Sequence, residues 1–244
     1  MSRPLSPTFP GAAAPGVLTL ALLAALLAGC GDDHAFEPLA PGHWWVYAID
    51  ARILDEPRHS RYVARNVATG ELDGVPVVAR RAQASSVDYL HRGEDGVTRR
   101  AHRRGRHGAL SFDQPPRVLL PADPVPGTRW SVPSTLALIE SRTFARADRV
   151  IVRRYPVTLE KTLSARDATT EVPAGTFGDC LLVTGQGRTS VRTDRGNASA
   201  SVTVTTREWY APGIGLVRLE RDETSTSPFL KNGHQRWALL DYGD

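Results

Sequence analysis

Alternation of apolar and polar side chains with a period of two residues is the pattern that most constrains this fold. It is clearest in residues 151–163, where Val157, Leu159 and Leu163 fall on one face and polar residues on the other. Residues 44–49 and 201–210 show the same alternation, with many aromatic and β-branched side chains. Glycine, proline and aspartate bound these runs, as is typical of half-buried strands that end in turns.

The remaining alternating runs predict a protein made of many amphipathic strands. We expect further strands at 60–68, 75–82, 86–92, 96–103, 117–120, 134–145, 179–186, 214–220 and 235–242. No strong helical period is present; residues 134–142 are the best candidate for one short helix, although alternation suits them as well. The expected fold is all-β and mainly antiparallel: a curved sheet or half-barrel, with at most a short helix.

The N-terminus reads as an export signal. An apolar run from Val17 to Leu27 would extend only about 16 Å as a helix, too short for a bilayer core about 30 Å thick. Small residues then precede Cys30, and the sequence Leu-Ala-Gly-Cys resembles a bacterial lipobox. In that class the thiol receives a diacylglyceryl group, the peptide is cut before the cysteine and the new amine is acylated, which gives durable anchoring.

This resemblance divides the chain into three parts. Residues 1–29 are the expected signal peptide, residues 30–35 the lipidated cysteine and a tether, and residues 36–244 a single β-rich domain. The expected location is the bacterial cell envelope, with the domain facing the periplasm. The sequence leaves open whether the anchor lies in the inner or the outer membrane.

Charge and cysteine content narrow the function further. Loss of residues 1–29 removes one arginine and no acid, which leaves 29 basic against 26 acidic residues. A balance this close to neutral does not point to nucleic acid as a partner.

If Cys30 is lipidated, Cys180 has no partner for a disulfide, so burial alone must stabilise the domain. Because Cys180 lies in an apolar run, we expect it to be a core residue rather than a nucleophile.

Four blocks, at residues 36–45, 125–130, 172–180 and 209–217, together resemble a broad set of bacterial lipoproteins. The third contains VPAGTF followed by Cys180, and the fourth reads WYAPGIGLV. The resemblance implies a curved antiparallel sheet akin to the Lol-type lipoprotein carriers, an incomplete barrel that holds acyl chains. It implies no catalytic residues, and it does not explain the Arg- and His-rich stretch at 99–107.

Two groups of residues are candidates for binding. Three tryptophans on predicted strands are candidates for lining an apolar cavity, although core packing is the commoner use of such residues: Trp45, Trp130 and Trp209. A run of arginines is the candidate for contact with lipid headgroups, with a solvated hairpin as the alternative: Arg99, Arg100, Arg103, Arg104 and Arg106.

The chain carries no motif of a hydrolase, a zinc protease, a phosphate-binding loop or a redox pair. We therefore expect a non-enzymatic envelope lipoprotein with no cofactor and no metal. It would be attached to the membrane through Cys30, and its curved sheet would bind an apolar or lipidic ligand or an envelope protein. The alternative is a structural or interaction lipoprotein with a filled core.

Substitution Cys30→Ser tests the anchor. The variant loses the acceptor thiol, so it should carry no lipid and should leave the membrane fraction. Mass spectrometry of the N-terminal peptide and fractionation of the envelope measure both effects. A Cys180→Ser variant is the matched control and should remain lipidated. Equal lipidation of Cys30→Ser would contradict the assignment.

Overall fold

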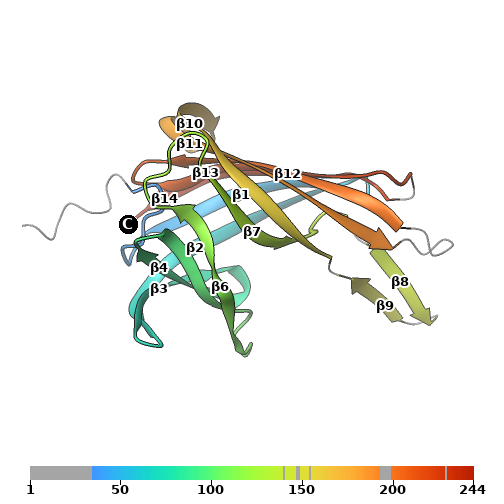
Figure 1. The fold of residues 1–244 in the computed structure, drawn as a ribbon, viewed down its shortest axis with the longest axis horizontal. Coiled ribbons are helices and arrows are strands. Elements are labelled where there is room, and N and C mark those ends of the chain that lie inside the picture. Colours follow the sequence, from blue (N-terminus) through green and yellow to red (C-terminus); the bar gives the residue numbers. More distant parts are fainter. Residues whose placement is uncertain (1–34, 140, 147–148, 154, 193–198, 229) are drawn as a thin grey trace, which may run out of the picture. The chain divides into compact units, whose positions relative to one another are not determined.

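Twelve antiparallel strands form one sheet in the order β6-β5-β4-β3-β2-β1-β14-β13-β12-β11-β10-β7, while β8 and β9 pair with each other (Figure 1). The structure is a computed structural model that describes residues 35–139, 141–146, 149–153, 155–192, 199–228 and 230–244. Its strands are β1 Trp44–Ile53, β2 Glu56–Leu72, β3 Val75–Ala82, β4 Val87–Gly93, β5 Gly96–Arg103, β6 Leu110–Pro121, β7 Arg129–Thr135, β8 Ser141–Arg146, β9 Arg149–Arg153, β10 Pro156–Val172, β11 Gly175–Arg192, β12 Ser199–Ala211, β13 Gly215–Ser225 and β14 Gly233–Gly243.

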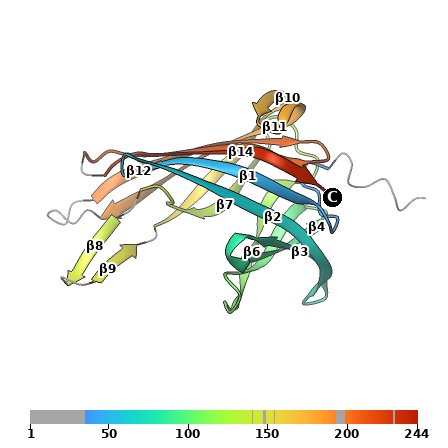
Figure 2. The ribbon, with the colours of Figure 1, turned by 180° about the vertical axis from the view of Figure 1, so that it is seen from behind.

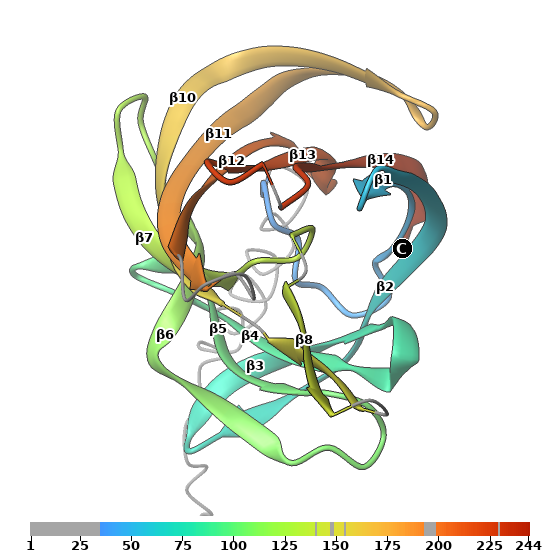
Figure 3. The ribbon, with the colours of Figure 1, turned by 90° about the vertical axis from the view of Figure 1, so that its right-hand side faces the viewer.

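The predicted fold class is confirmed. The sheet is antiparallel throughout and curls into a nearly closed barrel (Figure 3), and the one helical element among the described residues is the short turn Gln83–Ser85. The chain runs up and down between neighbours, and β1 pairs with β14 to join its two halves. Within the described part of the chain, no helix is long and apolar enough to cross a membrane.

Consecutive strands β6 and β7 are the two edges of the sheet. Strand β6 contains Pro115, Pro116 and Pro121, which have no N–H to donate to a neighbouring strand. Apolar side chains instead connect the two edges, because Leu120 of β6 and Trp130 of β7 belong to one cluster with Leu163. The barrel is thus closed at this seam by packing rather than by a ladder of hydrogen bonds.

Residues 134–145 were predicted as one strand, with a short helix as the alternative at 134–142, and both predictions are wrong. Strand β7 ends at Thr135 and β8 begins at Ser141, with no helix in the described residues between them. The cause is Glu223, which is fully buried on β13. Its carboxylate accepts hydrogen bonds from the backbone N–H groups of residues 137, 138 and 139 at 2.8, 2.9 and 2.8 Å.

This arrangement closes one end of the barrel. Arg221 neutralises the buried carboxylate, with Nε 2.8 Å from Glu223 Oε1. Leu138 is 1% exposed and packs against Gly233. A Cβ added to Gly233 would lie only 2.2 Å from the Cβ of Leu138. Around it, Leu136 and Ile139 join a cluster of interior residues: Val157, Leu159, Val191, Val202 and Val204.

A second segment enters the barrel from the N-terminal side. Residues 36–40, here called the N-terminal plug, have Glu37, Pro38 and Leu39 buried. Arg80 forms an ion pair with Glu37 and donates to the Pro38 carbonyl at 2.9 Å. The fully buried Asn66 amide donates to the carbonyls of Pro38 and Ala40 at 3.1 and 3.0 Å. This segment is therefore part of the core of the fold.

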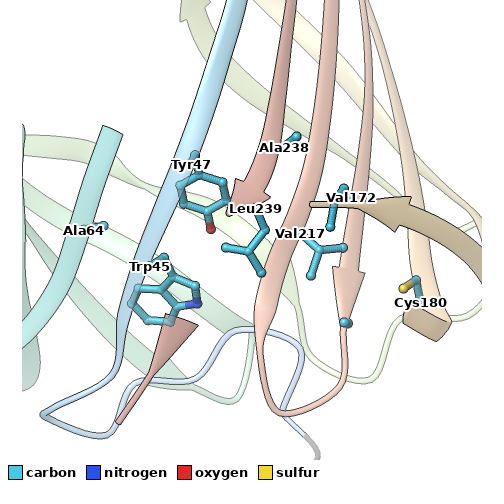
Figure 4. Packing of buried hydrophobic residues seen from close by; sticks show 9 residues of the cluster. Trp45, Tyr47, Ala64, Val172, Cys180, Val217, Ala238 and Leu239 are labelled. Carbon is cyan, nitrogen blue, oxygen red and sulfur yellow. The ribbon is translucent and has the colours of Figure 1, made fainter. Parts of the chain in front are cut away.

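The β10–β11 hairpin arches over β12, β13 and β14 as a second layer (Figures 2 and 3). At its tip Gly175 has a φ of 135°, which glycine adopts readily, and Ala174 donates to the Leu239 carbonyl at 3.0 Å. Val172 and Cys180 pack there against Val217 (Figure 4). Cys180 is fully buried, and burial raises the pKa of its thiol to about 11, so it is the core residue that the sequence predicted.

Substitution Glu223→Gln tests whether one carboxylate holds the β7–β8 segment. The amide cannot accept from all three N–H groups and leaves Arg221 without its counter-charge, so the free energy of unfolding should fall by about 3–5 kcal/mol. Urea unfolding followed by tryptophan fluorescence measures it. Glu56→Gln is the control, because its ion pair with Arg58 is exposed and should contribute under about 1 kcal/mol. Equal losses in the two variants would contradict this role.

Candidate ligand-binding groove

The seam between β6 and β7 contains a groove of about 630 Å³. It is lined by the β4–β5 turn, by β5 and by both edge strands, chiefly through Thr98, Arg100, Pro116, Val118, Pro121, Arg129 and Trp130. We call it the seam groove. Its volume is within the range of small-molecule sites. The groove exists because the prolines of β6 prevent the two edges from pairing.

Two buried polar groups at the seam groove have no hydrogen-bond partner among the described residues. Thr98 is 7% exposed, and its side-chain hydroxyl is buried and has no partner. The indole N–H of Trp130 is also buried and unpaired. A buried polar group without a partner costs about 1–3 kcal/mol, so such groups are uncommon unless something else binds them. Because an indole N–H can only donate, the complementary ligand atom is an acceptor oxygen.

The rest of the lining is amphipathic. Pro116, Val118 and Pro121 supply apolar surface from β6. Arg100 and Arg129 form no ion pair with any described residue, although Glu94 and Asp95 of the β4–β5 turn also border the groove. The arrangement suits an elongated molecule with an apolar part and an oxygen-bearing polar group.

The ionisable groups inside the barrel bind one another instead. Lys161 Nζ lies 2.7 Å from Glu208 Oε2, and the Tyr210 hydroxyl donates to the same oxygen at 2.6 Å. Burial and the Glu208 charge hold the pKa of Tyr210 well above its usual range. All three side chains are at least nine-tenths buried, so this group neutralises charge in the core.

The structure does not bring the three predicted tryptophans together. Trp45 is 4% exposed, donates to the Ile214 carbonyl at 2.6 Å and packs under the Arg80 guanidinium at 4.5 Å. Trp209 lies on β12, with the Arg218 guanidinium 4.9 Å from its ring centre. Of the three, Trp130 alone lines the seam groove. Lipidation at Cys30 falls outside the described residues.

The predicted arginine run divides between the interior and the surface. Arg99 binds Asp113 at 2.7 Å and Asp88 at 3.2 Å. Burial lowers the pKa of Arg99, but these two acids outweigh it and raise the pKa above its ordinary value. Arg100 lines the seam groove, Arg103 ends β5, and the other two, Arg104 and Arg106, are exposed in the β5–β6 turn.

Sequence reasoning missed Thr98 and the apolar wall of β6. The available signal was the Gln-Pro-Pro sequence at 114–116, which indicates an edge strand. The partner edge, β7, could not be identified from the sequence. Strand β7 pairs with β10, but the β8–β9 hairpin lies between these two strands in the chain.

Comparison with known proteins shows structural likeness alone. No family model matches the chain, and no curated protein matches its sequence. A candidate lipoprotein of Parabacteroides distasonis has a TM-score of 0.39 and 15% identity, over 87% of this chain and 100% of its own. A candidate exported protein with a YmcC-like fold from Bacteroides fragilis has a TM-score of 0.39 and 14% identity, over 86% and 100%. Likeness at this level carries no argument about function.

Among the described residues, no group of three or more metal-binding side chains is present.

Substitution Thr98→Val tests whether the unpaired hydroxyl is a structural group. Valine has nearly the same shape and removes an unsatisfied donor, so the free energy of unfolding should stay the same or rise by up to about 1 kcal/mol. Thr170→Val is the matched control: Thr170 is 5% exposed and its hydroxyl accepts from Arg218, so this variant should lose stability. Urea unfolding of both compares them. A clear loss in Thr98→Val would show that its hydroxyl has a partner within the fold.

Proposed function

We propose that this chain is a non-enzymatic lipoprotein of a bacterial envelope, anchored through Cys30 with its domain facing the periplasm. The domain binds a lipidic molecule at the seam groove, with an apolar chain against the β6 wall and an acceptor oxygen on Thr98 and Trp130. The observation that carries the proposal is the pair of buried, unpaired donors in an open groove.

The short tether supports a role close to the membrane. Four residues lie between Cys30 and Ala35, so Ala35 is the fifth residue after Cys30, and the Gly213 N–H already donates to the Ala35 carbonyl at 3.0 Å. Five extended residues span at most about 18 Å. The domain would therefore stay within reach of lipids at the membrane surface.

The ligand site in this proposal differs from the one that the Lol-type resemblance implied. That resemblance predicted acyl chains inside an incomplete barrel. Here the N-terminal plug enters the barrel beside Arg80 and Asn66, and residues 136–139 fill the Glu223 end. We therefore assign binding to the open seam instead of the interior.

A structural lipoprotein with a filled core is the second candidate. The same two segments favour it, because they contribute Leu39 and Leu138 to the interior, 6% and 1% exposed. This reading leaves the unpaired donors of the seam groove without a role, and we rank it second for that reason.

Crosslinking in vesicles tests the proposed site. The lipidated protein is reconstituted with lysophosphatidylglycerol that carries a diazirine in its acyl chain. After illumination, the labelled peptides should contain residues 115–121 or 128–130. Loss of one hydrogen bond, about 1 kcal/mol, should lower the labelling about fivefold in Thr98→Val and in Trp130→Phe.

Trp209→Phe is the control for loss of a tryptophan away from the groove and should label as the parent does. Labels spread over other strands, or equal yields in all variants, would contradict binding at the seam. That result would leave the structural reading.

A further inference from the structure

A row of side chains crosses the outer face of six strands, β1 to β6. Directly opposed residues in the sheet are Trp44 and Arg65, Arg65 and Arg81, Arg81 and Val87, Val87 and Arg103, and Arg103 and Leu110. Opposed residues of an antiparallel pair have side chains on the same face. The strand register therefore places three arginines from distant parts of the sequence in one line.

This face is the outer one. Strand β2 buries Ala64 and Asn66 toward the interior, so Arg65 between them points outward. Likewise Arg80 binds Glu37 of the N-terminal plug, and its neighbour Arg81 is exposed. The β10–β11 hairpin lies over β12–β14 and not over β2 to β5 (Figure 3). Within the row itself, Val87 is buried at 7% exposed between Arg81 and Arg103.

Exposed apolar side chains lie near the row on β2 and β6. Val63 and Val67, two residues before and after Arg65, are 41% and 39% exposed. Leu110 and Phe112 on β6 are 39% and 44% exposed. The two pairs lie on β2 and β6, on either side of β3, β4 and β5, so exposed apolar side chains border the arginine row on both of its sides.

The cations of this surface have no acidic partners. Arg65, Arg81, Arg103 and the turn residues Arg104 and Arg106 form no ion pair with any described residue, and the acids nearest in the strand ladder, Asp88 and Asp113, bind Arg99. Some arginines elsewhere on the domain are paired, as in Arg58–Glu56 and Arg166–Asp123.

We propose that this surface, called the basic–apolar face and formed by Trp44, Val63, Arg65, Val67, Arg81, Arg103, Arg104, Arg106, Leu110 and Phe112, lies against an anionic lipid membrane. Arginines bind the lipid phosphates, and the exposed valine, leucine and phenylalanine side chains enter the headgroup region. A soluble polyanion would match the charges but would leave the apolar residues in water. The inference rests on the anchoring part of the proposed function and not on the seam groove.

The anchor and this face have different roles. The lipid at Cys30 keeps the protein on the membrane whatever the lipid charge. The basic–apolar face selects which side of the domain turns toward the membrane, and this selection depends on anionic lipid and on salt.

Trypsin cleavage of the anchored protein tests the orientation. The lipidated protein is reconstituted in vesicles of phosphatidylcholine alone or with 40% phosphatidylglycerol, and cleavage after Arg104 and Arg106 is followed by mass spectrometry. In the anionic vesicles these sites should be cleaved at least tenfold more slowly, and 0.5 M NaCl should remove most of the protection. Each arginine at the membrane surface contributes about fivefold in affinity for the anionic membrane. The double variant Arg65→Gln/Arg81→Gln should therefore also lose the protection from cleavage.

Two controls separate orientation from other effects. Arg58→Gln/Arg166→Gln removes the same charge from paired, exposed positions outside the face and should retain full protection. Val63→Ser/Val67→Ser keeps all charges and should lose part of the protection, because apolar insertion is removed.

Equal cleavage in neutral and anionic vesicles overturns the proposal. So does protection that appears only in native envelopes, since the face would then bind an acidic protein. Failure of the anchor has a different signature, because the protein would then not sediment with either type of vesicle.

Discussion

The proline-bearing edge of β6 is the constraint on which the rest of this sheet depends. A curled sheet of twelve strands can bring its edges together, and full pairing would remove both edges. Pro115, Pro116 and Pro121 deny β6 the donors that such pairing needs. The structure instead fills the barrel from both ends and joins the edges by apolar packing, and the seam groove is the part of the junction that packing leaves open.

Filling the barrel requires polar groups to enter it, and the two entering segments find side-chain partners for their backbone groups. Backbone groups brought inside without a strand neighbour need acceptors or donors from side chains. Glu223 supplies acceptors to the β7–β8 segment, and Asn66 and Arg80 supply donors to the N-terminal plug. Seven other buried side-chain atoms of the described residues also lack a hydrogen-bond partner, and what distinguishes Thr98 and Trp130 from them is their place in the lining of the seam groove.

The sequence predicts the strands well, because half-buried strands repeat every two residues and end at glycine and proline. It could not separate β9 from β10 within 151–163, since alternation continues across the break. The sequence also could not show that Glu223 would end β7. The three N–H groups that bind its carboxylate lie 84 to 86 residues away in the chain, and no local pattern in the sequence indicates such a contact. Of the residues that line the groove, Trp130 and Arg100 were predicted from the sequence as binding candidates. The other unpaired donor of the groove, Thr98, lies within a strand that reads as ordinary, and only the tertiary fold shows that its hydroxyl lacks a partner.

Net charge near zero conceals an uneven distribution. The sequence has 30 basic and 26 acidic residues, a balance that by itself argues against a strongly anionic partner. The fold places Glu37, Glu208 and Glu223 inside the barrel, each with its own cation. Acids bound in this way are screened from the outer face of β2 to β5, where strand register alone aligns Arg65, Arg81 and Arg103. Composition counts these charges together, but only the register determines which of them a membrane would meet.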